Sequence, residues 1–274
     1  MIEIRDLTIQ KGARKILKQV SFEVQPGEVF AVLGANGAGK STLLRAIGGE
    51  ENMVEGAISI NHRNILQWAP RRLARMRGIL SQKIELSFAL SVLEVVLMGR
   101  YAYASLESKE ESMDVAKWCL QQVALESMQH RNILTLSGGE QQRVHLARVL
   151  AQVYCRQPRH TRFLLLDEPL ASLDLAHQHR LLHLLRRLSR EESFGIFIVV
   201  HDMNLAAQYA DRILLLHRGE TLSIGRPEEV FNESNIQQAY GIRAVVMQNP
   251  VYQCPQITAF HEIPDSALPN RSAS

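Results

Sequence analysis

A glycine-rich loop between an apolar run and a helix-forming segment is the feature that most constrains the fold. Val29 to Leu33 has the length and composition of a buried strand, and Thr42 to Ile47 reads as a helix. The spacing between them is G-x-x-x-x-G-K-S, which lets backbone N–H groups face phosphates without a Cβ in the way. The loop residues are Gly34, Ala35, Asn36, Gly37, Ala38, Gly39, Lys40 and Ser41, followed by Thr42. Strand, loop and helix in this order predict a nucleotide-binding α/β domain.

Charged and hydroxyl side chains at two strand ends predict the chemistry at the phosphates. Lys40 supplies a mobile positive charge, and the Ser41 hydroxyl is placed to bind Mg²⁺. Asp167 ends a second apolar run, where a buried carboxylate is costly unless it meets a cation, so we expect it at the same Mg²⁺. Glu168 follows and is suited to polarising a water in line with the γ-phosphate. Its alternative role is that of an acidic residue at the start of a helix.

The segment Leu136-Ser137-Gly138-Gly139-Glu140 has two possible roles. Ser137 and Glu140 fit a capping box, S-x-x-E, which opens a helix over Gln141 to Ala151 and needs no ligand. Two glycines are nevertheless poor helix starters, because each costs about 1 kcal/mol relative to Ala. Bare backbone at a helix N-terminus is what a phosphate would contact, so we favour a second phosphate-facing surface.

A histidine follows the third apolar run. His201 stands after Ile196 to Val200, at the carboxyl end of a predicted parallel strand, where the ligands of open α/β sheets gather. A histidine in such a place is more often a satisfied structural residue. Because this one is expected beside the phosphate site, we favour a contact with the γ-phosphate.

Apolar runs that alternate with helical stretches predict a mainly parallel sheet with helices on both faces. Period-two alternation near the N-terminus indicates half-buried strands, and a helical pattern over about 83–155 indicates an inserted subdomain. The runs are Phe163 to Leu166, Phe194 to Val200 and Ile213 to Leu216, and the alternating segments are Ile2 to Arg5 and Ser21 to Val24. We expect an α/β fold of the P-loop NTPase type with an N-terminal antiparallel β subdomain and an α-helical subdomain. This domain would span 1–244, with a C-terminal tail over 245–274.

Composition and charge limit the partners. The formal net charge of the 274 residues is only +3, so we expect no nucleic-acid partner. No apolar run approaches the roughly 20 residues that cross a bilayer as a helix, so a role at a membrane would require docking on other chains. Arg71, Arg72, Arg75 and Arg77 form a basic patch that we interpret as solvated surface, with a phospholipid or partner contact as the alternative.

Together these motifs resemble the nucleotide-binding subunits of ATP-binding-cassette (ABC) transporters, from residue 2 to about residue 250. The matches are Gly34 to Ser41 with Walker A, Gln82 with the Q-loop, Leu136 to Gln141 with the signature motif, Leu164 to Asp167 with Walker B, Glu168 with the catalytic glutamate, Ser172-Leu173-Asp174 with the D-loop, and His201 with the H-loop. The resemblance implies ATP and Mg²⁺ as ligands. It places Glu168, His201 and Gln82 in catalysis, and Ser41, Gln82 and Asp167 around the metal.

The resemblance also implies a homodimer that encloses two ATP molecules. Each ATP would lie between Walker A of one copy and Ser137, Gly138 and Gly139 of the other, with Asp174 also among the nucleotide-binding residues. ATP binding would close this dimer, and hydrolysis would release it. Many relatives stack an aromatic ring on adenine, whereas residues 9–14 here read Ile-Gln-Lys-Gly-Ala-Arg, so stacking would fall to Arg14 or an aliphatic stem.

Finer features are similar to the importers of haem, iron siderophores and cobalamin. Val92 to Arg100 resembles their segment after the Q-loop, and three further segments are most similar to haem (hemin) import ATPases: Gly138 to Val144, Ala147 to Gln152 and Asp174 to Gln178. The resemblance implies two integral-membrane permease subunits, a periplasmic haem-binding protein acting through them, and a peripheral position on the cytoplasmic side of the cell inner membrane. Ferric-siderophore or cobalamin import is the alternative within transport. A soluble ABC ATPase for iron–sulfur assembly is the alternative of another class.

Overall fold

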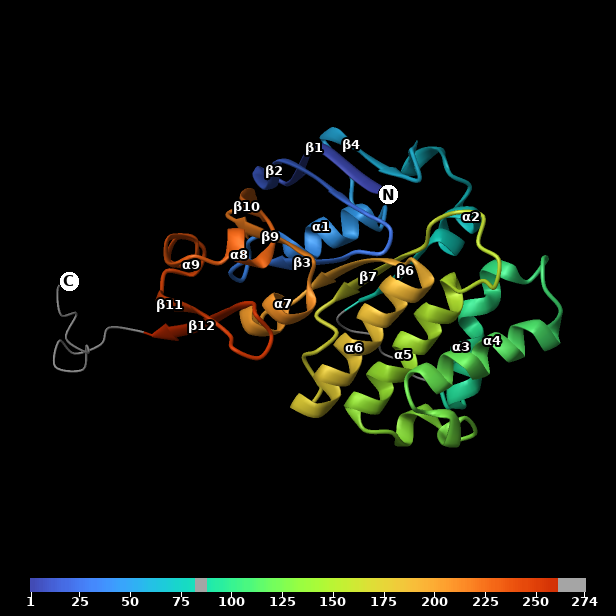
Figure 1. The fold of residues 1–274 in the computed structure, drawn as a ribbon. Coiled ribbons are helices and arrows are strands. Elements are labelled where there is room, and N and C mark those ends of the chain that lie inside the picture. The colour runs from blue at the N-terminus through green and yellow to red at the C-terminus, as the bar shows by residue number, and fades with distance from the viewer. Residues whose placement is uncertain (82–87, 261–274) are drawn as a thin grey trace, which may run out of the picture.

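The computed structural model describes residues 1–81 and 88–260 (Figure 1). In this part of the chain a six-stranded sheet has the order β10-β9-β3-β8-β7-β6, and every neighbouring pair is parallel except β10 with β9. Its strands are β3 (Val29–Leu33), β6 (Arg77–Leu80), β7 (Phe163–Asp167), β8 (Gly195–Val199), β9 (Arg212–His217) and β10 (Glu220–Gly225). The predicted α/β fold with a mainly parallel sheet is confirmed.

A second, antiparallel sheet covers one side of the first. Its order is β2-β1-β4-β5, and its strands are β1 (Ile2–Lys11), β2 (Arg14–Val24), β4 (Glu55–Ile60) and β5 (Arg63–Asn64). Helix α1 (Lys40–Ile47) lies between the two sheets, as Figure 1 shows. The expected N-terminal antiparallel β subdomain is therefore present.

The continuous apolar strands are explained by burial of both faces of the parallel sheet. Along β3, Phe30 and Val32 point into the layer that contains α1, whereas Val29, Ala31 and Leu33 point into the helical layer. The ring centroid of Phe30 lies 5.1 Å from that of Phe22 and 6.1 Å from that of Phe197. Full burial of one such side chain contributes about 1.5–3 kcal/mol. Packing against the two cores thereby fixes the orientation of β3 and the position of its carboxyl end.

Helices cover the other face of the parallel sheet, and several begin with the same cap. Ser91, Ser108 and Ser137 each form a capping box with the glutamate three positions later. These helices are α3 (Val92–Met98), η2 (Gly99–Tyr103), α4 (Lys109–Gln122), η3 (Glu126–Met128), η4 (Ile133–Thr135), α5 (Gly138–Val153), α6 (Leu175–Glu192) and α7 (Met203–Tyr209). Two further helices, η1 (Ile65–Gln67) and α2 (Pro70–Met76), bury their apolar residues in the core that contains α1. The expected helical subdomain is present, and its residues 83–87 lie outside the described part. Among the described helices, none has the length and apolar composition needed to span a bilayer.

The C-terminal region contains more regular structure than the sequence indicated. Helices α8 (Pro227–Val230) and α9 (Glu233–Tyr240) precede an antiparallel pair, β11 (Arg243–Gln248) and β12 (Pro255–Phe260). The predicted boundary between residues 244 and 245 thus falls inside β11. The Asn204 side chain donates to the Ile257 carbonyl oxygen (3.1 Å) and accepts from its N–H (2.7 Å), which ties β12 to α7. Residues 261–274 of the predicted tail lie outside the described part.

Candidate functional site

The phosphate loop has a backbone conformation that residues other than glycine could adopt only with strain. Gly34 has φ 144°, and a Cβ there would lie 2.2 Å from the carbonyl oxygen of Leu216. Gly37 (φ 78°) and Gly39 (φ 107°) also need the left-handed region that favours glycine. Gly39 immediately precedes α1, so the loop ends at the positive pole of that helix. The backbone here has the form of an anion-binding loop.

Lys40 is buried inside this loop. Its Nζ donates hydrogen bonds to the carbonyl oxygens of Gly34 (2.8 Å) and Ala35 (3.1 Å). Burial lowers the pKa of the ammonium, and the nearby carboxylates of Glu168 and Asp167 oppose that shift. The positive charge is therefore held at the place where the phosphates of a nucleotide would replace the two carbonyl oxygens as partners.

Asp167 and Ser41 meet as a Mg²⁺ site requires. Ser41 Oγ donates to Asp167 Oδ1 over 3.2 Å, and Asp167 is only 7% exposed. Burial raises the pKa of Asp167, and the hydrogen bond from Ser41 lowers it by less. A buried carboxylate beside a hydroxyl offers the oxygen ligands that Mg²⁺ prefers, so the two residues fit the ion. Gln82, the third predicted ligand, lies outside the described residues.

Glu168 and His201 follow neighbouring parallel strands and contact each other. His201 Nε2 lies 2.6 Å from Glu168 Oε1. Glu168 has φ 51°, a left-handed conformation that is uncommon for residues other than glycine, asparagine and aspartate. The alternative role of Glu168 at a helix start does not apply, because a turn follows it and α6 begins only at Leu175. Backbone strain beside a strand end is typical of functional sites.

The two glycines of the signature segment differ in their surroundings. Ser137 forms the predicted capping box at the start of α5, with its N–H 2.8 Å from Glu140 Oε2. A Cβ on Gly139 would lie 3.2 Å from Leu173 Cδ2, so close packing explains that glycine. A Cβ on Gly138 would have no atom of the described residues within 4 Å of it. Packing within one copy of the chain therefore gives no reason for glycine at position 138.

The starts of α5 and α6 are connected to the segment after Glu168. Gln142 Nε2 of α5 donates to the Pro169 carbonyl oxygen (2.6 Å). Asp174 caps α6, and its Oδ1 lies 2.8 Å from both the backbone N and the Nδ1 of His177. In Figure 1 these helix starts lie at the lower end of the helical layer, whereas α1 lies above, between the sheets.

One contact to the phosphate loop was not predicted from the sequence. The Gly34 N–H donates to the hydroxyl of Tyr240 (3.1 Å), which ends α9. Burial raises the pKa of Tyr240 to about 12, so its hydroxyl stays neutral at physiological pH. The local sequence around Tyr240 shows only an aromatic residue before a glycine and does not indicate this role. The contact ties the C-terminal region to the predicted nucleotide site.

The predicted site residues fall into two groups in the structure. The loop residues 34–42 share the carboxyl edge of the parallel sheet with Asp167, Glu168 and His201. Ser137, Gly138, Gly139 and Asp174 lie at the starts of α5 and α6. The fold and the loop define a P-loop nucleotide-binding protein of the α/β class.

Comparison with known proteins identifies the family. The family model for the ABC transporter matches residues 17–171, more than half of the chain. The hemin import ATP-binding protein HmuV of Deinococcus radiodurans is 44% identical over 258 residues, which cover 94% of this chain and 97% of that protein. HmuV of Bordetella avium is 43% identical over 249 residues, with 91% and 95% covered. This chain belongs to the ABC transporter family, as an ATP-binding subunit.

Solved structures agree with this assignment. A transporter described as of the metal-chelate ABC type, in an inward-facing conformation, is 26% identical, has a TM-score of 0.79 and covers 95% of this chain and 97% of its own. The dimeric bacterial ABC transporter cassette MJ0796 is 30% identical, with a TM-score of 0.71 and coverage of 82% and 98%. A further structure of MJ0796 is a dimer in a post-hydrolysis state, bound to ADP and Pi.

The raised pKa of Asp167 predicts a pH-dependent gain in stability for Asp167→Asn in the nucleotide-free protein. A carboxyl whose pKa rises on folding stabilises the fold only below its ordinary pKa, and this contribution is lost as the pH rises through the folded value. At pH 7.5 the variant should therefore have the higher free energy of unfolding, and the gain should shrink toward pH 5. Urea unfolding at several pH values measures this difference.

Asp174→Asn is the control, because hydrogen bonds from His177 lower the pKa of Asp174 and reverse the sign. That variant should gain no stability at pH 7.5. Equal gains for the two variants, or a gain for Asp167→Asn that does not change with pH, would contradict the assigned effect of burial.

The open space around Gly138 predicts that a substitution there lowers the ATPase rate without lowering the stability of the fold. Gly138→Ala should leave the free energy of unfolding unchanged or raise it by about 1 kcal/mol, because alanine favours a helix. Its ATPase rate should fall at least roughly tenfold, since the added methyl blocks the bare helix start from a phosphate. Gly139→Ala, the matched variant, should be less stable than Gly138→Ala, because its Cβ would lie close to Leu173 and to the Ser172 carbonyl oxygen. Full ATPase activity of Gly138→Ala would remove the phosphate-facing role.

Proposed function

We propose that this chain is the ATP-hydrolysing subunit of an importer that carries haem across the cell inner membrane. Haem is proposed as the cargo because the chain is similar to hemin import ATP-binding proteins, at 44% and 43% identity over more than nine tenths of its length. The phosphate loop, with its strained glycines and buried lysine, supports the use of ATP.

In the proposed reaction, the loop N–H groups and Lys40 hold the phosphates of ATP. The Glu168 carboxylate accepts a proton from a water as that water attacks the γ-phosphorus. A bond forms from the water oxygen to phosphorus, the bond to the bridging oxygen breaks, and ADP and phosphate are released. His201 is proposed to contact the γ-phosphate, and its 2.6 Å contact with Glu168 Oε1 orients the carboxylate at the same place.

Ser41 and Asp167 would hold Mg²⁺, whose charge offsets that of the phosphates. Gln82 is proposed as a further ligand of the ion and as a catalytic residue, because it matches the Q-loop. The burial of Asp167 beside the Ser41 hydroxyl supports its role as a ligand of the ion.

Two copies of the chain are proposed to form the working unit. Gly138 has free space in one copy, and the start of α5 offers bare backbone that a phosphate held by a second copy would contact. The dimeric form of the similar cassette MJ0796 supports this arrangement. Ser137, Gly138, Gly139 and Asp174 of one copy would then complete the site built on Lys40 of the other.

The dimer is proposed to sit on the cytoplasmic side of the inner membrane, against two integral-membrane permease subunits. The permeases would receive haem from a periplasmic haem-binding protein. The likeness to a transporter described as of the metal-chelate type, over 95% of this chain, supports such an assembly.

Uptake of labelled haem by vesicles that contain the complete complex tests this function. ATP on the side of this subunit should drive haem uptake, and Glu168→Gln should abolish uptake while ATP still binds, because only proton transfer is removed. Unlabelled ferric siderophore and cobalamin serve as competitors. Haem uptake that needs no ATP, or ATP-driven uptake of a siderophore or cobalamin with none of haem, would reject haem as the cargo.

A further inference from the structure

A cavity of about 580 Å³ lies away from the predicted nucleotide site. It is bounded by α2, by η2 and by the segment 155–162 that leads into β7. Arg162 lines it just before β7 begins, whereas Asp167 lies at the opposite end of that strand. The cavity is within the size range of sites for compact organic ligands. Neither the proposed ATP chemistry nor the proposed dimer uses it.

The cavity carries an excess of positive charge. Arg72, Arg75 and Arg159 line it, and among the described residues no salt bridge joins any of the three to a carboxylate. Glu107 also lines the cavity, but it is paired with the buried Arg100. Guanidinium groups recognise carboxylates and phosphates with two parallel hydrogen bonds. The site therefore favours a ligand with anionic groups.

Apolar and aromatic side chains form the rest of the wall. Trp68, Tyr103 and Leu106 line the cavity, and Leu106 remains 60% exposed. The guanidinium carbons of Arg75 and Arg100 lie 5.7 Å and 3.9 Å from the ring centroid of Tyr103. A simple inorganic anion would leave the side chain of Leu106 and part of Trp68 in water, since only Tyr103 of the three is buried. A wall with both arginines and aromatic side chains fits a ligand that has an apolar, aromatic body and anionic groups.

Two metal-binding side chains lie on the same wall. Cys155 is a free, half-buried cysteine, and both Cys155 and His160 line the cavity. The ring of His160 stands edge-on to Trp68, with centroids 5.6 Å apart. A cysteine thiolate or a histidine imidazole is the usual protein ligand of haem iron. Haem also has a flat apolar body and two carboxylates, so its chemistry matches all three parts of the wall.

We infer that this cavity, built by Arg72, Arg75 and Arg159 with Trp68, Tyr103, Cys155 and His160, is a binding site for haem on the ATPase subunit itself. The inference rests on the proposed function, which brings haem to the side of the membrane where this subunit lies. The arginines bind the carboxylates, the aromatic rings contact the macrocycle, and Cys155 or His160 ligates the iron. Such a site lets the subunit take up haem apart from the permease.

Titration of the purified full-length chain with hemin, followed through the Soret absorbance, tests the site. The wild type should bind one hemin per chain, and Arg72→Glu with Arg75→Glu should raise the Kd at least roughly tenfold. Arg159→Glu should raise it too, and this exposed position leaves the fold intact. Cys155→Ser or His160→Gln should shift the Soret band of the complex, whereas binding of iron-free protoporphyrin IX should not respond to either change.

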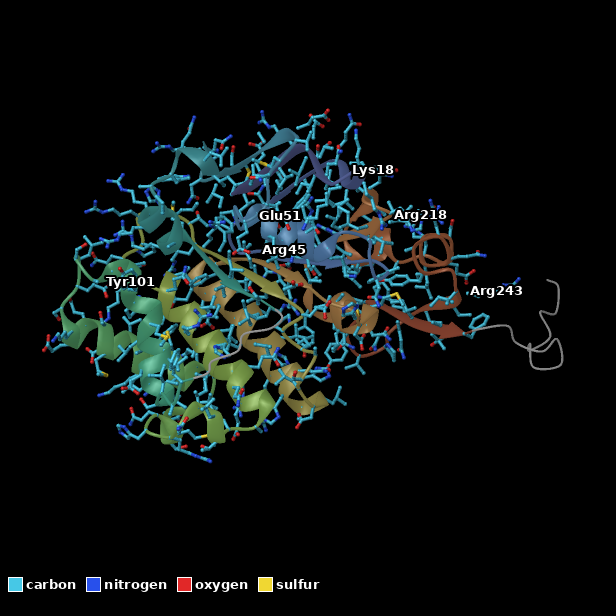
Figure 2. The ribbon with its side chains drawn as sticks, turned by 180° about the vertical axis from the view of Figure 1, so that it is seen from behind. Lys18, Arg45, Glu51, Tyr101, Arg218 and Arg243 are labelled. Atoms are coloured by element: carbon cyan, nitrogen blue, oxygen red, sulfur yellow. The ribbon has the colours of Figure 1, made fainter. Side chains whose placement is uncertain are left out.

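Arg243→Glu is the matched control, because Arg243 is exposed on β11, and Figure 2 shows it on the opposite side of the molecule from Tyr101 of η2. Its Kd for hemin should equal that of the wild type. Equal Kd values for all variants would overturn the inference, as would binding of phosphatidylglycerol vesicles through these arginines without hemin binding. Because haem uptake is measured on the complete complex, a failure here leaves that result standing. Failure of uptake with intact hemin binding would instead reject the proposed cargo.

Discussion

The parallel pairing of β3, β7 and β8 is the constraint on which the rest of the structure depends. It brings the carboxyl ends of three strands to one edge, so the phosphate loop, Asp167 with Glu168, and His201 become neighbours although they are far apart in sequence. Burial of both faces of the sheet fixes these directions, because each strand alternates its side chains between two cores. The cost of burying Asp167 is reduced by the hydrogen bond from Ser41, and a Mg²⁺ ion held at this place, as proposed, would offset the charge of the carboxylate.

Predictions from the sequence were most accurate for features of the structure that depend on residues close together in the chain. The glycine spacing of the loop, the apolar strand before it and the capping box at Ser137 all depend on neighbouring residues, and the structure contains each of them. Reasoning failed where the cause is distant. The contact of Tyr240 with Gly34 spans most of the chain and leaves no local signal. The β11–β12 pair crosses the predicted tail boundary. It packs through a few scattered buried residues, Ala244, Cys254 and Ile257, and through the hydrogen bonds of Asn204, and no periodicity in the sequence reveals these contacts.

The structure also separates two readings that the sequence left open. Gly139 packs against Leu173 and is explained within one chain, whereas Gly138 is not. Meanwhile Lys40 is turned onto the carbonyl oxygens of its own loop. In the proposed arrangement, the chain holds one half of a phosphate site at the sheet edge, and the starts of α5 and α6 provide the other half. We propose that these halves meet across two copies of the chain, so that nucleotide binding and dimer closure become one event.

Mixing two inactive variants tests most directly whether two copies of the chain share one ATP site. Lys40→Ala removes the charge at the loop, and Ser137→Arg blocks the start of α5, so neither homodimer should hydrolyse ATP. A heterodimer has one site in which both halves are intact, and an equal mixture should regain about a quarter of wild-type ATPase activity if the copies pair at random. A mixture that stays inactive, although cross-linking shows that heterodimers have formed, would contradict the shared site.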